Sequence, residues 1–191
     1  MGDESRRGKK AKGIVVRSLV LDCETTGLIQ NSVKPLSQQP SIIEYFGQIV
    51  EGTEVVEELE FFCDPGFPVS EEITRITGIK PEQVKGQPLF SHFSEAVRGQ
   101  IESVDEVVAH NMSYDRAMVN FEMKRAETEL IWPANLICTV EGTEHLKGHR
   151  LNLSALHEFL FGEPFTGAHR ARVDVAALTR CFIELRERGE L

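Results

Sequence analysis

Cysteine is scarce in this chain, and its residues stand far apart. The four cysteines, Cys23, Cys63, Cys138 and Cys181, form no C-x-x-C pair. Zinc sites and disulfide frameworks in small domains normally use closely spaced cysteines. The scatter therefore argues against such a framework, and it favours buried, reduced thiols in a cytoplasmic protein.

A long apolar run is also missing. No stretch approaches the roughly 20 apolar residues that cross a bilayer, and no apolar secretory segment follows the basic N-terminus. We therefore expect neither a membrane partner nor export. The 191 residues, 41% of them hydrophobic and 27% charged, are typical of one globular domain.

Positive charge is in short supply as well, since the formal net charge is −9. Basic residues outnumber acidic ones in residues 1–12, so the rest of the chain is more acidic still. General binding of nucleic acid rests on neutralising phosphates, so this body must hold any nucleic acid locally, through bound cations and a short groove. We expect residues 1–13 to form a disordered basic tail, either solubilising or loosely attracting nucleic acid, and residues 14–191 to form the domain.

The most informative run joins an apolar strand to two carboxylates. It reads Leu-Val-Leu-Asp-Cys-Glu-Thr-Thr-Gly over residues 19–27. Successive side chains of a strand point to opposite faces, so Asp22 and Glu24 share one face and Cys23 points the other way, into the core. Carboxylates this close repel each other unless they are protonated or share a cation. The run therefore predicts a divalent-metal site, with a solvated acidic strand end as the plain alternative.

Hydrophobic patterning predicts the order of the remaining elements. Strands are expected at residues 15–23, 42–50, 55–63, 107–109 and 136–139. Helices are expected at residues 73–77, 88–101, 114–126, 153–160 and 175–185, with a long polar loop at residues 29–41. Asn152 is a candidate helix cap, and Gly78 and Gly189 are candidate helix ends. Three strands followed by helices that alternate with short strands indicate an α/β layered domain with a mixed sheet.

Two further carboxylates, Asp115 and Asp174, fall at the starts of predicted helices. The helix N-terminus stabilises a carboxylate in its first turn, which by itself explains either residue. It does not explain why each follows a short apolar strand or a Gly-rich loop with a histidine nearby. His169 lies five positions before Asp174, roughly 140° around a helix, so we expect it on the loop. An imidazole there is a candidate general base, with a plain surface histidine as the alternative. We interpret the remaining histidines outside these segments as surface residues: His92, His145, His149 and His157.

Three segments together resemble a known enzyme family. Residues 22–27 read Asp-Cys-Glu-Thr-Thr-Gly, residues 110–115 read His-Asn-Met-Ser-Tyr-Asp, and residues 169–174 read His-Arg-Ala-Arg-Val-Asp. In this order they resemble the three exonuclease motifs of the DnaQ-like (DEDDh) 3′–5′ exonucleases. Intervening stretches also resemble that family, at residues 62–84, 137–139 and 151–156. The resemblance implies a ribonuclease H-like fold, a mixed five-stranded sheet flanked by helices. A sister group with tyrosine as base would need Tyr where Arg170 stands, so the histidine version is the better match.

The resemblance also implies a role for each matched residue. By this similarity, Asp22, Glu24 and Asp174 would hold one metal ion, and Asp22 would hold a second ion together with Asp115 through water. His169 would deprotonate the attacking water. Hard oxygen ligands without thiolate favour Mg²⁺ or Mn²⁺, and a pair of such ions suits phosphodiester hydrolysis.

The same resemblance points to a pocket for the last nucleotide at a 3′ end. Thr25 would meet the terminal 3′-hydroxyl, and Leu28 would pack against the last base. The full set of implied substrate-binding residues is Thr25, Leu28, Ile76, Thr77, Asn111 and Tyr114. From the residues alone, Thr25 is equally a turn former and Tyr114 equally a core residue.

Three functional hypotheses follow. The leading one is a metal-dependent 3′–5′ exonuclease that releases nucleoside 5′-monophosphates, preferably from single-stranded DNA. The second is an RNA-trimming 3′–5′ exoribonuclease, because discrimination rests on how the 2′-hydroxyl is accommodated. The third is a proofreading subunit that binds a DNA polymerase or another replication or repair protein. The polar loop at residues 29–41 either clamps a strand, excludes duplex or is an idle insertion.

Overall fold

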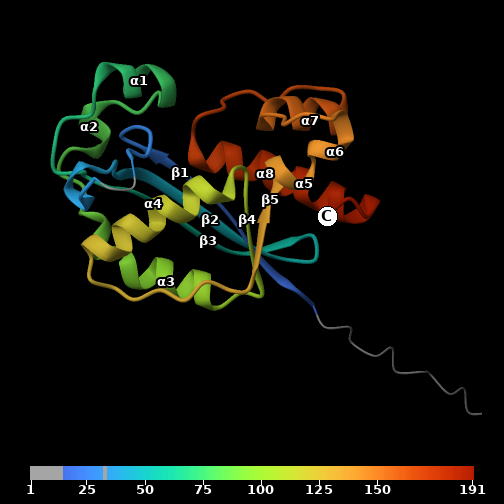
Figure 1. Ribbon diagram of the computed structural model, residues 1–191, viewed down its shortest axis with the longest axis horizontal. Helices are drawn as coiled ribbons and strands as arrows, with labels where there is room; N and C mark the ends of the chain where they lie inside the picture. Colours follow the sequence, from blue (N-terminus) through green and yellow to red (C-terminus); the bar gives the residue numbers. More distant parts are fainter. Residues whose placement is uncertain (1–14, 32–33) are drawn as a thin grey trace, which may run out of the picture.

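The fold is built on one mixed sheet of five strands (Figure 1). A computed structural model of the chain describes residues 15–31 and 34–191. The strands are β1 (Arg17–Thr25), β2 (Ile42–Glu51), β3 (Glu54–Phe62), β4 (Glu106–Ala109) and β5 (Asn135–Cys138). Their order across the sheet is β3-β2-β1-β4-β5. Strand β2 is antiparallel to β1 and β3, whereas β4 pairs in parallel with β1 and β5. The expected mixed five-stranded α/β fold is confirmed.

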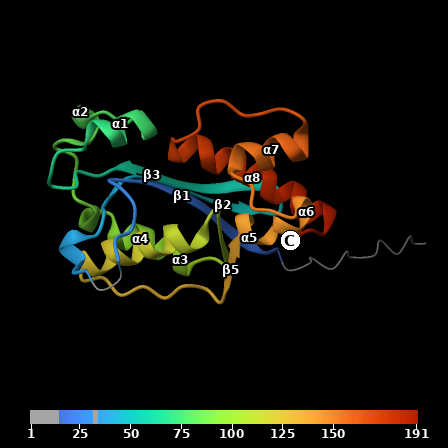
Figure 2. The ribbon, with the colours of Figure 1, turned by 45° about the horizontal axis from the view of Figure 1, so that its top comes forward.

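Helices cover both faces of this sheet. Figure 2 shows α3 and α4 on one face and α7 and α8 on the other. The helices are α1 (Glu71–Thr77), α2 (Pro81–Val84), α3 (Ser94–Glu102), α4 (Met112–Arg125), α5 (Thr139–Gly142), α6 (Glu144–Lys147), α7 (Leu153–Phe161) and α8 (Ala171–Arg188). Alternate side chains of β1 feed two cores, since Leu21 packs in the core of α4 and Val20 packs in the core of α8. Within the described residues, no helix is both long and apolar enough to span a bilayer.

Helix ends lie where the capping residues predict them. The Oγ of Ser70 accepts a hydrogen bond from the Ile73 nitrogen at 3.3 Å at the start of α1. Asn152 caps α7 in the same way, with its Oδ1 2.8 Å from the Ala155 nitrogen. Helices α1 and α8 end at glycines in the left-handed conformation, with φ +70 at both Gly78 and Gly189.

Other boundaries differ from the predictions. The helix expected at residues 88–101 is divided, because a 3-10 turn at Phe90–His92 precedes α3. The chain turns at Phe93 so that Phe90 and Phe93 both pack on Phe61, with ring centroids 5.8 and 4.0 Å away. Strand β1 begins two residues later than expected. The four-residue helices α2, α5 and α6 were not predicted, because they are too short to show a hydrophobic period.

The prediction that His157 lies on the surface is wrong. Its side chain is buried in α7, its Nδ1 lies 2.8 Å from the Glu163 carbonyl oxygen, and its ring lies 4.7 Å from that of Phe161. Position 157 falls between Leu153 and Leu160 at helical spacing, and that signal places it on the packed face. The predicted basic tail and the domain boundary at residue 14 lie outside the described residues.

Candidate active site

The end of β1 carries the first two carboxylates of the site. Asp22 and Glu24 lie on the face of the strand that Val20 turns toward α8, and both are partly buried. Cys23 between them is buried in the opposite core, as the alternation predicts. The pairing of β1 with β2 becomes irregular after Glu24. The strand therefore ends just past the two carboxylates and leaves them at the edge of the sheet.

The first turn of α4 brings a third carboxylate beside β1. Asp115 is only 3% exposed, and its Oδ1 accepts a hydrogen bond from the backbone nitrogen of Cys23 at 3.2 Å. This bond attaches α4 to the residue between Asp22 and Glu24. The sharp passage from β4 into α4 is made by Asn111, which adopts the left-handed conformation with φ +88.

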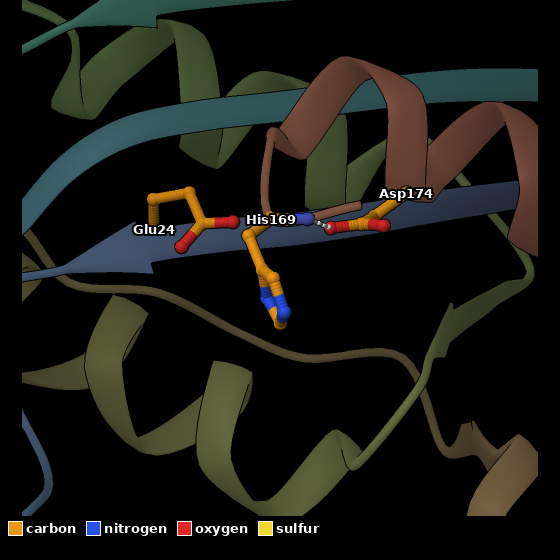
Figure 3. A group of neighbouring side chains, drawn as sticks. All are labelled: Glu24, His169 and Asp174. Carbon is orange, nitrogen blue, oxygen red and sulfur yellow. Dashed lines mark hydrogen bonds between the residues drawn. The ribbon is translucent and has the colours of Figure 1, made fainter. Parts of the chain in front are cut away.

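The start of α8 supplies the last two groups, as Figure 3 shows. The backbone nitrogen of His169 donates a hydrogen bond to Oδ2 of Asp174 at 2.8 Å. His169 has φ +70 and stands exposed on the loop before α8, where the sequence predicted it. Ligand atoms of Glu24, His169 and Asp174 all lie within 4.8 Å of one another. Segments far apart in the sequence therefore meet at one point.

Burial and mutual repulsion raise the pKa values of these carboxyl groups above their ordinary values. Burial, followed by the charge of Asp115, raises the pKa of Asp22 well above its ordinary value. Burial and the charge of Asp174 raise the pKa of Glu24 to about 7, and burial raises the pKa of Asp115 to about 8. The pKa of Asp174 is raised too, chiefly by burial. A bound cation would favour the charged carboxylates and so offset both the cost of burial and the mutual repulsion.

The donor set fits divalent cations. Carboxylate oxygens are the ligands that Mg²⁺ and Mn²⁺ prefer, and Cys23 turns its sulfur into the core. Oxygen ligands lie about 2.0–2.1 Å from Mg²⁺, so two ligands of one ion are no more than roughly 4.2 Å apart. Among the predicted ligands, Glu24 and Asp174 have carboxylate oxygens within 4.8 Å of each other, which is close to this span.

A cleft of about 740 Å³ opens beside Glu24 and His169. All six predicted substrate contacts line it: Thr25, Leu28, Ile76, Thr77, Asn111 and Tyr114. The side chains of Leu28 and Ile76 are 78% and 46% exposed, so two apolar groups face the solvent here. The structure thus brings together residues from β1, α1 and α4 that are far apart in the chain.

Tyr114 holds the turn that leads to Leu28. Its hydroxyl donates a hydrogen bond to the carbonyl oxygen of Gly27 at 2.8 Å and lies 2.6 Å from Oγ1 of Thr25. The Thr25 hydroxyl also reaches the Gly27 carbonyl, at 3.1 Å. Thr25 therefore shapes the turn, and Tyr114 packs against the core, as the local interpretation expected of each. Both residues also line the cleft.

Several residues beside the site were not predicted. The start of α1 adds Ser70, Glu72 and Ile73 to the large cleft. A smaller cleft of about 280 Å³ adjoins Asp22 and Asp174. Its other lining residues are His110, Asn152, Leu153, Ser154, Phe165, Ala168 and His169. The cap at Asn152 was the available signal, but it said nothing about where α7 would lie.

Comparison with known proteins agrees with this geometry. The family described as Exonuclease (RNase_T) matches residues 19–182, which is most of the chain. The DNA polymerase III subunit epsilon of Rickettsia felis is 29% identical over 175 residues, covering 89% of this chain and 74% of that protein. A PolC-type DNA polymerase III from Caldanaerobacter subterraneus is 30% identical over 176 residues. This match covers 89% of the present chain but only 12% of the polymerase.

Solved structures share the fold at lower identity. The nuclease domain of 3'hExo, a DEDDh family member bound to rAMP, aligns with a TM-score of 0.72 and 15% identity over 94% of this chain and 96% of its own. Exonuclease X in complex with 5′ overhanging duplex DNA aligns with a TM-score of 0.62 and 23% identity, over 90% of this chain and 93% of its own. With the family match, these likenesses confirm a ribonuclease H-like nuclease fold. The chain therefore belongs to the DnaQ-like (DEDDh) 3′–5′ exonuclease family.

Proposed function

We propose that this protein is a metal-dependent 3′–5′ exonuclease that releases nucleoside 5′-monophosphates from the 3′ ends of single-stranded DNA. The observation that carries the proposal is the cluster of Glu24, His169 and Asp174 beside an open cleft. Asp22 lines the adjoining smaller cleft, and Asp115 is bound to the backbone between Asp22 and Glu24. The relatives named as DNA polymerase III components support DNA as the substrate.

The four carboxylates are suited to hold two divalent ions. Asp22, Glu24 and Asp174 would hold one, and Asp22 with Asp115 through water would hold the other. When bound, such ions would lower the pKa of water and stabilise charge on the phosphate. His169 accepts the proton of the attacking water on an imidazole nitrogen. The water oxygen bonds to phosphorus as the bond to O3′ of the preceding nucleotide breaks, so the phosphate leaves on the released nucleoside. The O3′ oxygen of the shortened strand takes up a proton from solvent and becomes the new 3′-hydroxyl.

The large cleft suits an unpaired terminal nucleotide. The exposed side chains of Leu28 and Ile76 offer apolar surfaces on which a base can pack. Packing on the face of a base does not read its edges, so it tolerates any sequence. We therefore expect all four nucleotides to be released at comparable rates.

The test is digestion of 5′-labelled oligonucleotides with Mg²⁺, with Mn²⁺ or with EDTA. Single-stranded DNA is expected to give a ladder of shortened products and free 5′-mononucleotides, and EDTA is expected to stop it. Asp22→Asn should reduce cleavage to background, and His169→Ala should lower the rate by about 10²–10⁴-fold. The control is Glu129→Gln, which changes an exposed carboxylate beyond α4. Digestion at the wild-type rate by Asp22→Asn would overturn the mechanism.

Proofreading beside a DNA polymerase is a second candidate, favoured by the names of the relatives. Co-purification with a polymerase, or stimulation by one, distinguishes it from a free-standing enzyme. The rAMP bound to the 3'hExo nuclease domain is the reason to include matched RNA oligonucleotides. Faster cleavage of RNA than of DNA would assign the protein as an exoribonuclease.

A further inference from the structure

An ion pair between a fully buried carboxylate and a half-exposed arginine attaches strand β2 to the start of α8. Glu44 is fully buried, and its Oε1 accepts a hydrogen bond from Nη2 of Arg170 at 2.9 Å. The Nε of Arg170 lies 3.3 and 3.2 Å from the two carboxylate oxygens. Oε2 also accepts from the backbone nitrogen of Ala171 at 3.1 Å. Glu44 therefore holds the two residues that directly follow His169.

Stability of the fold alone does not account for this ion pair. Glu44 pairs with Glu24 across β1 and β2, so it places another negative charge beside the carboxylate cluster. Well-packed apolar residues usually stabilise a buried position at least as well as an ion pair does. What the pair adds is direction, because a guanidinium bound to a carboxylate through two nitrogens has a defined orientation.

The loop that the pair restrains is the one that carries His169. It runs from Gly162 to Arg170, between α7 and α8. At the end of this loop, His169, Arg170 and Ala171 each donate a hydrogen bond to a carboxylate. The positive φ of His169 is costly for a residue other than glycine and persists only where its surroundings enforce it. The fixed residues that follow His169 are placed to enforce it.

We infer that Glu44 and Arg170 are positioning residues, which hold the His169 imidazole beside the metal ligands without touching the substrate themselves. This inference rests on the proposed function, since it assigns the pair a purpose in the same reaction.

Arg172 offers a matched control on the same helix. Its Nε and Nη2 bind Glu60 of β3 at 2.9 and 2.7 Å, and its Nη1 binds Glu58 at 3.1 Å. It therefore also joins α8 to the sheet through an arginine and carboxylates. Its carboxylate partners are more exposed than Glu44, however, and it holds no residue of the His169 loop.

The experiment compares steady-state kinetics of the wild type with four variants: Glu44→Gln, Arg170→Gln, the double variant and Arg172→Gln. Glutamine at 44 leaves one acceptor oxygen and turns an amide donor toward the donors of Arg170 and Ala171. We expect kcat on single-stranded DNA to fall about 10- to 100-fold in each single variant at position 44 or 170, as misplacement of a catalytic group predicts. KM should stay within about threefold. The double variant should fall no further, because neighbours that share one contact are not additive, and Arg172→Gln should match the wild type.

Thermal melting in EDTA accompanies the kinetics and identifies variants that do not fold. A folded Glu44→Gln protein with wild-type kcat would overturn the inference, as would an equal loss in Arg172→Gln or a change confined to KM. If Glu44→Gln does not fold, Arg170→Lys decides, because lysine keeps the charge but loses the two-nitrogen geometry and must lower kcat. An inactive wild type would refute the proposed function, whereas an active wild type with unimpaired variants refutes the positioning role alone.

Discussion

Single side chains in the carboxylate cluster link the stability of the metal-free protein to pH. The pKa values of Glu24 and Asp115 are about 7 and about 8 in the folded chain, against ordinary values of 4.5 and 3.8. The folded state therefore binds more protons than the unfolded state at neutral pH, and stability is lost as pH rises through the folded pKa values. We expect the free energy of unfolding in EDTA to fall by on the order of 1–2 kcal/mol between about pH 6.5 and 8. Urea titrations at the two pH values measure this fall.

Variants and metal supply the controls for that titration. Asp115→Asn should flatten the fall, and saturating Mg²⁺ should reverse it by binding the folded state. His110 has the opposite sign, because burial lowers its pKa to about 4, below its ordinary 6.5. Its contribution is lost as pH falls through about 6.5, so within the chosen interval it opposes the fall by only about 0.4 kcal/mol. A metal-free protein that gains stability from pH 6.5 to 8 would contradict the assigned shifts.

Leu28 should act on substrate binding alone. Its side chain is largely exposed beside the cleft, so truncating it removes little from the folded core. Loss of its contact with a terminal base should cost about 1 kcal/mol, so we expect Leu28→Ala to raise KM about fivefold with kcat nearly unchanged. Steady-state kinetics on a single-stranded oligonucleotide measures both constants. Ile131→Ala is the control, since Ile131 is 76% exposed on the segment before β5. Equal KM values in the two variants would remove Leu28 from the substrate site.

Residue placement was predictable where it depends on local geometry. Strand alternation is enough to put Asp22 and Glu24 together with Cys23 turned away, and helical rotation is enough to put His169 on a loop. The partnership of Glu44 with Arg170 was not predictable, because the two residues are 126 positions apart and neither lies in a pattern that requires the other.

At the level of helices and loops, Arg125 determines how the polar loop is held. Its guanidinium donates to Glu122 of the same helix at 2.7 Å. It also donates to the carbonyl oxygens of Leu36, Gln39 and Pro40 at 2.9–3.0 Å. This part of the loop therefore rests on the last turn of α4, whereas Asp115 lies in the first turn. The alternative that the loop closes over a strand finds no support in these contacts.

Removing this arginine should lower stability and leave catalysis intact. Arg125→Ala strips a buried carboxylate, Glu122, of its cation and releases the loop. We expect the free energy of unfolding to fall by about 2–4 kcal/mol and kcat at low temperature to stay within about twofold. Urea unfolding measures the free energy of unfolding, and oligonucleotide digestion measures kcat. Lys124→Ala, an exposed neighbour, should change neither, and a stable but inactive Arg125→Ala protein would place the loop in the active site after all.

All five strands were predicted, including the four-residue β4 and β5, whereas the four-residue helices were not. Strand β2 follows from its apolar run, and helices α1 and α7 follow from the candidate helix end at Gly78 and the candidate cap at Asn152. The division of residues 88–101 depends on packing against Phe61 of β3, which a local pattern does not contain.

For the protein as a whole, an acidic surface must bind an acidic polymer. With a net charge of −9, few phosphates can be neutralised by side chains, and bound cations must supply most of the attraction. We expect His169→Ala with Mg²⁺ to bind a labelled oligonucleotide with a weak salt dependence, corresponding to about two phosphates or fewer. EDTA should abolish binding. Fluorescence anisotropy across a series of NaCl concentrations, with and without EDTA, measures both effects. A steep fall of affinity with salt, or binding that EDTA does not change, would show that lysine and arginine side chains bind the oligonucleotide instead.

The order of the strands explains why the motifs converge. Strand β1 lies between β2 and β4, and it is parallel to β4. The end of β1, which carries the first motif, and the end of β4, which leads into the second motif, therefore lie at the same edge of the sheet. This much follows from the fold class. The orientation of the α7–α8 connection does not, because it depends on the buried contact with β2.

Arg125 holds its loop by carbonyl oxygens, and every amino acid carries one. The exposed side chains of Ser37 and Gln38 can therefore be exchanged as long as the backbone returns to the same three places. Gln39 differs, because its buried side-chain amide binds the backbone of the loop at residues 30, 31 and 34. A foreign peptide of equal length that keeps this glutamine should graft there without loss of the fold, whereas inserting or deleting a residue would pull the oxygens out of reach.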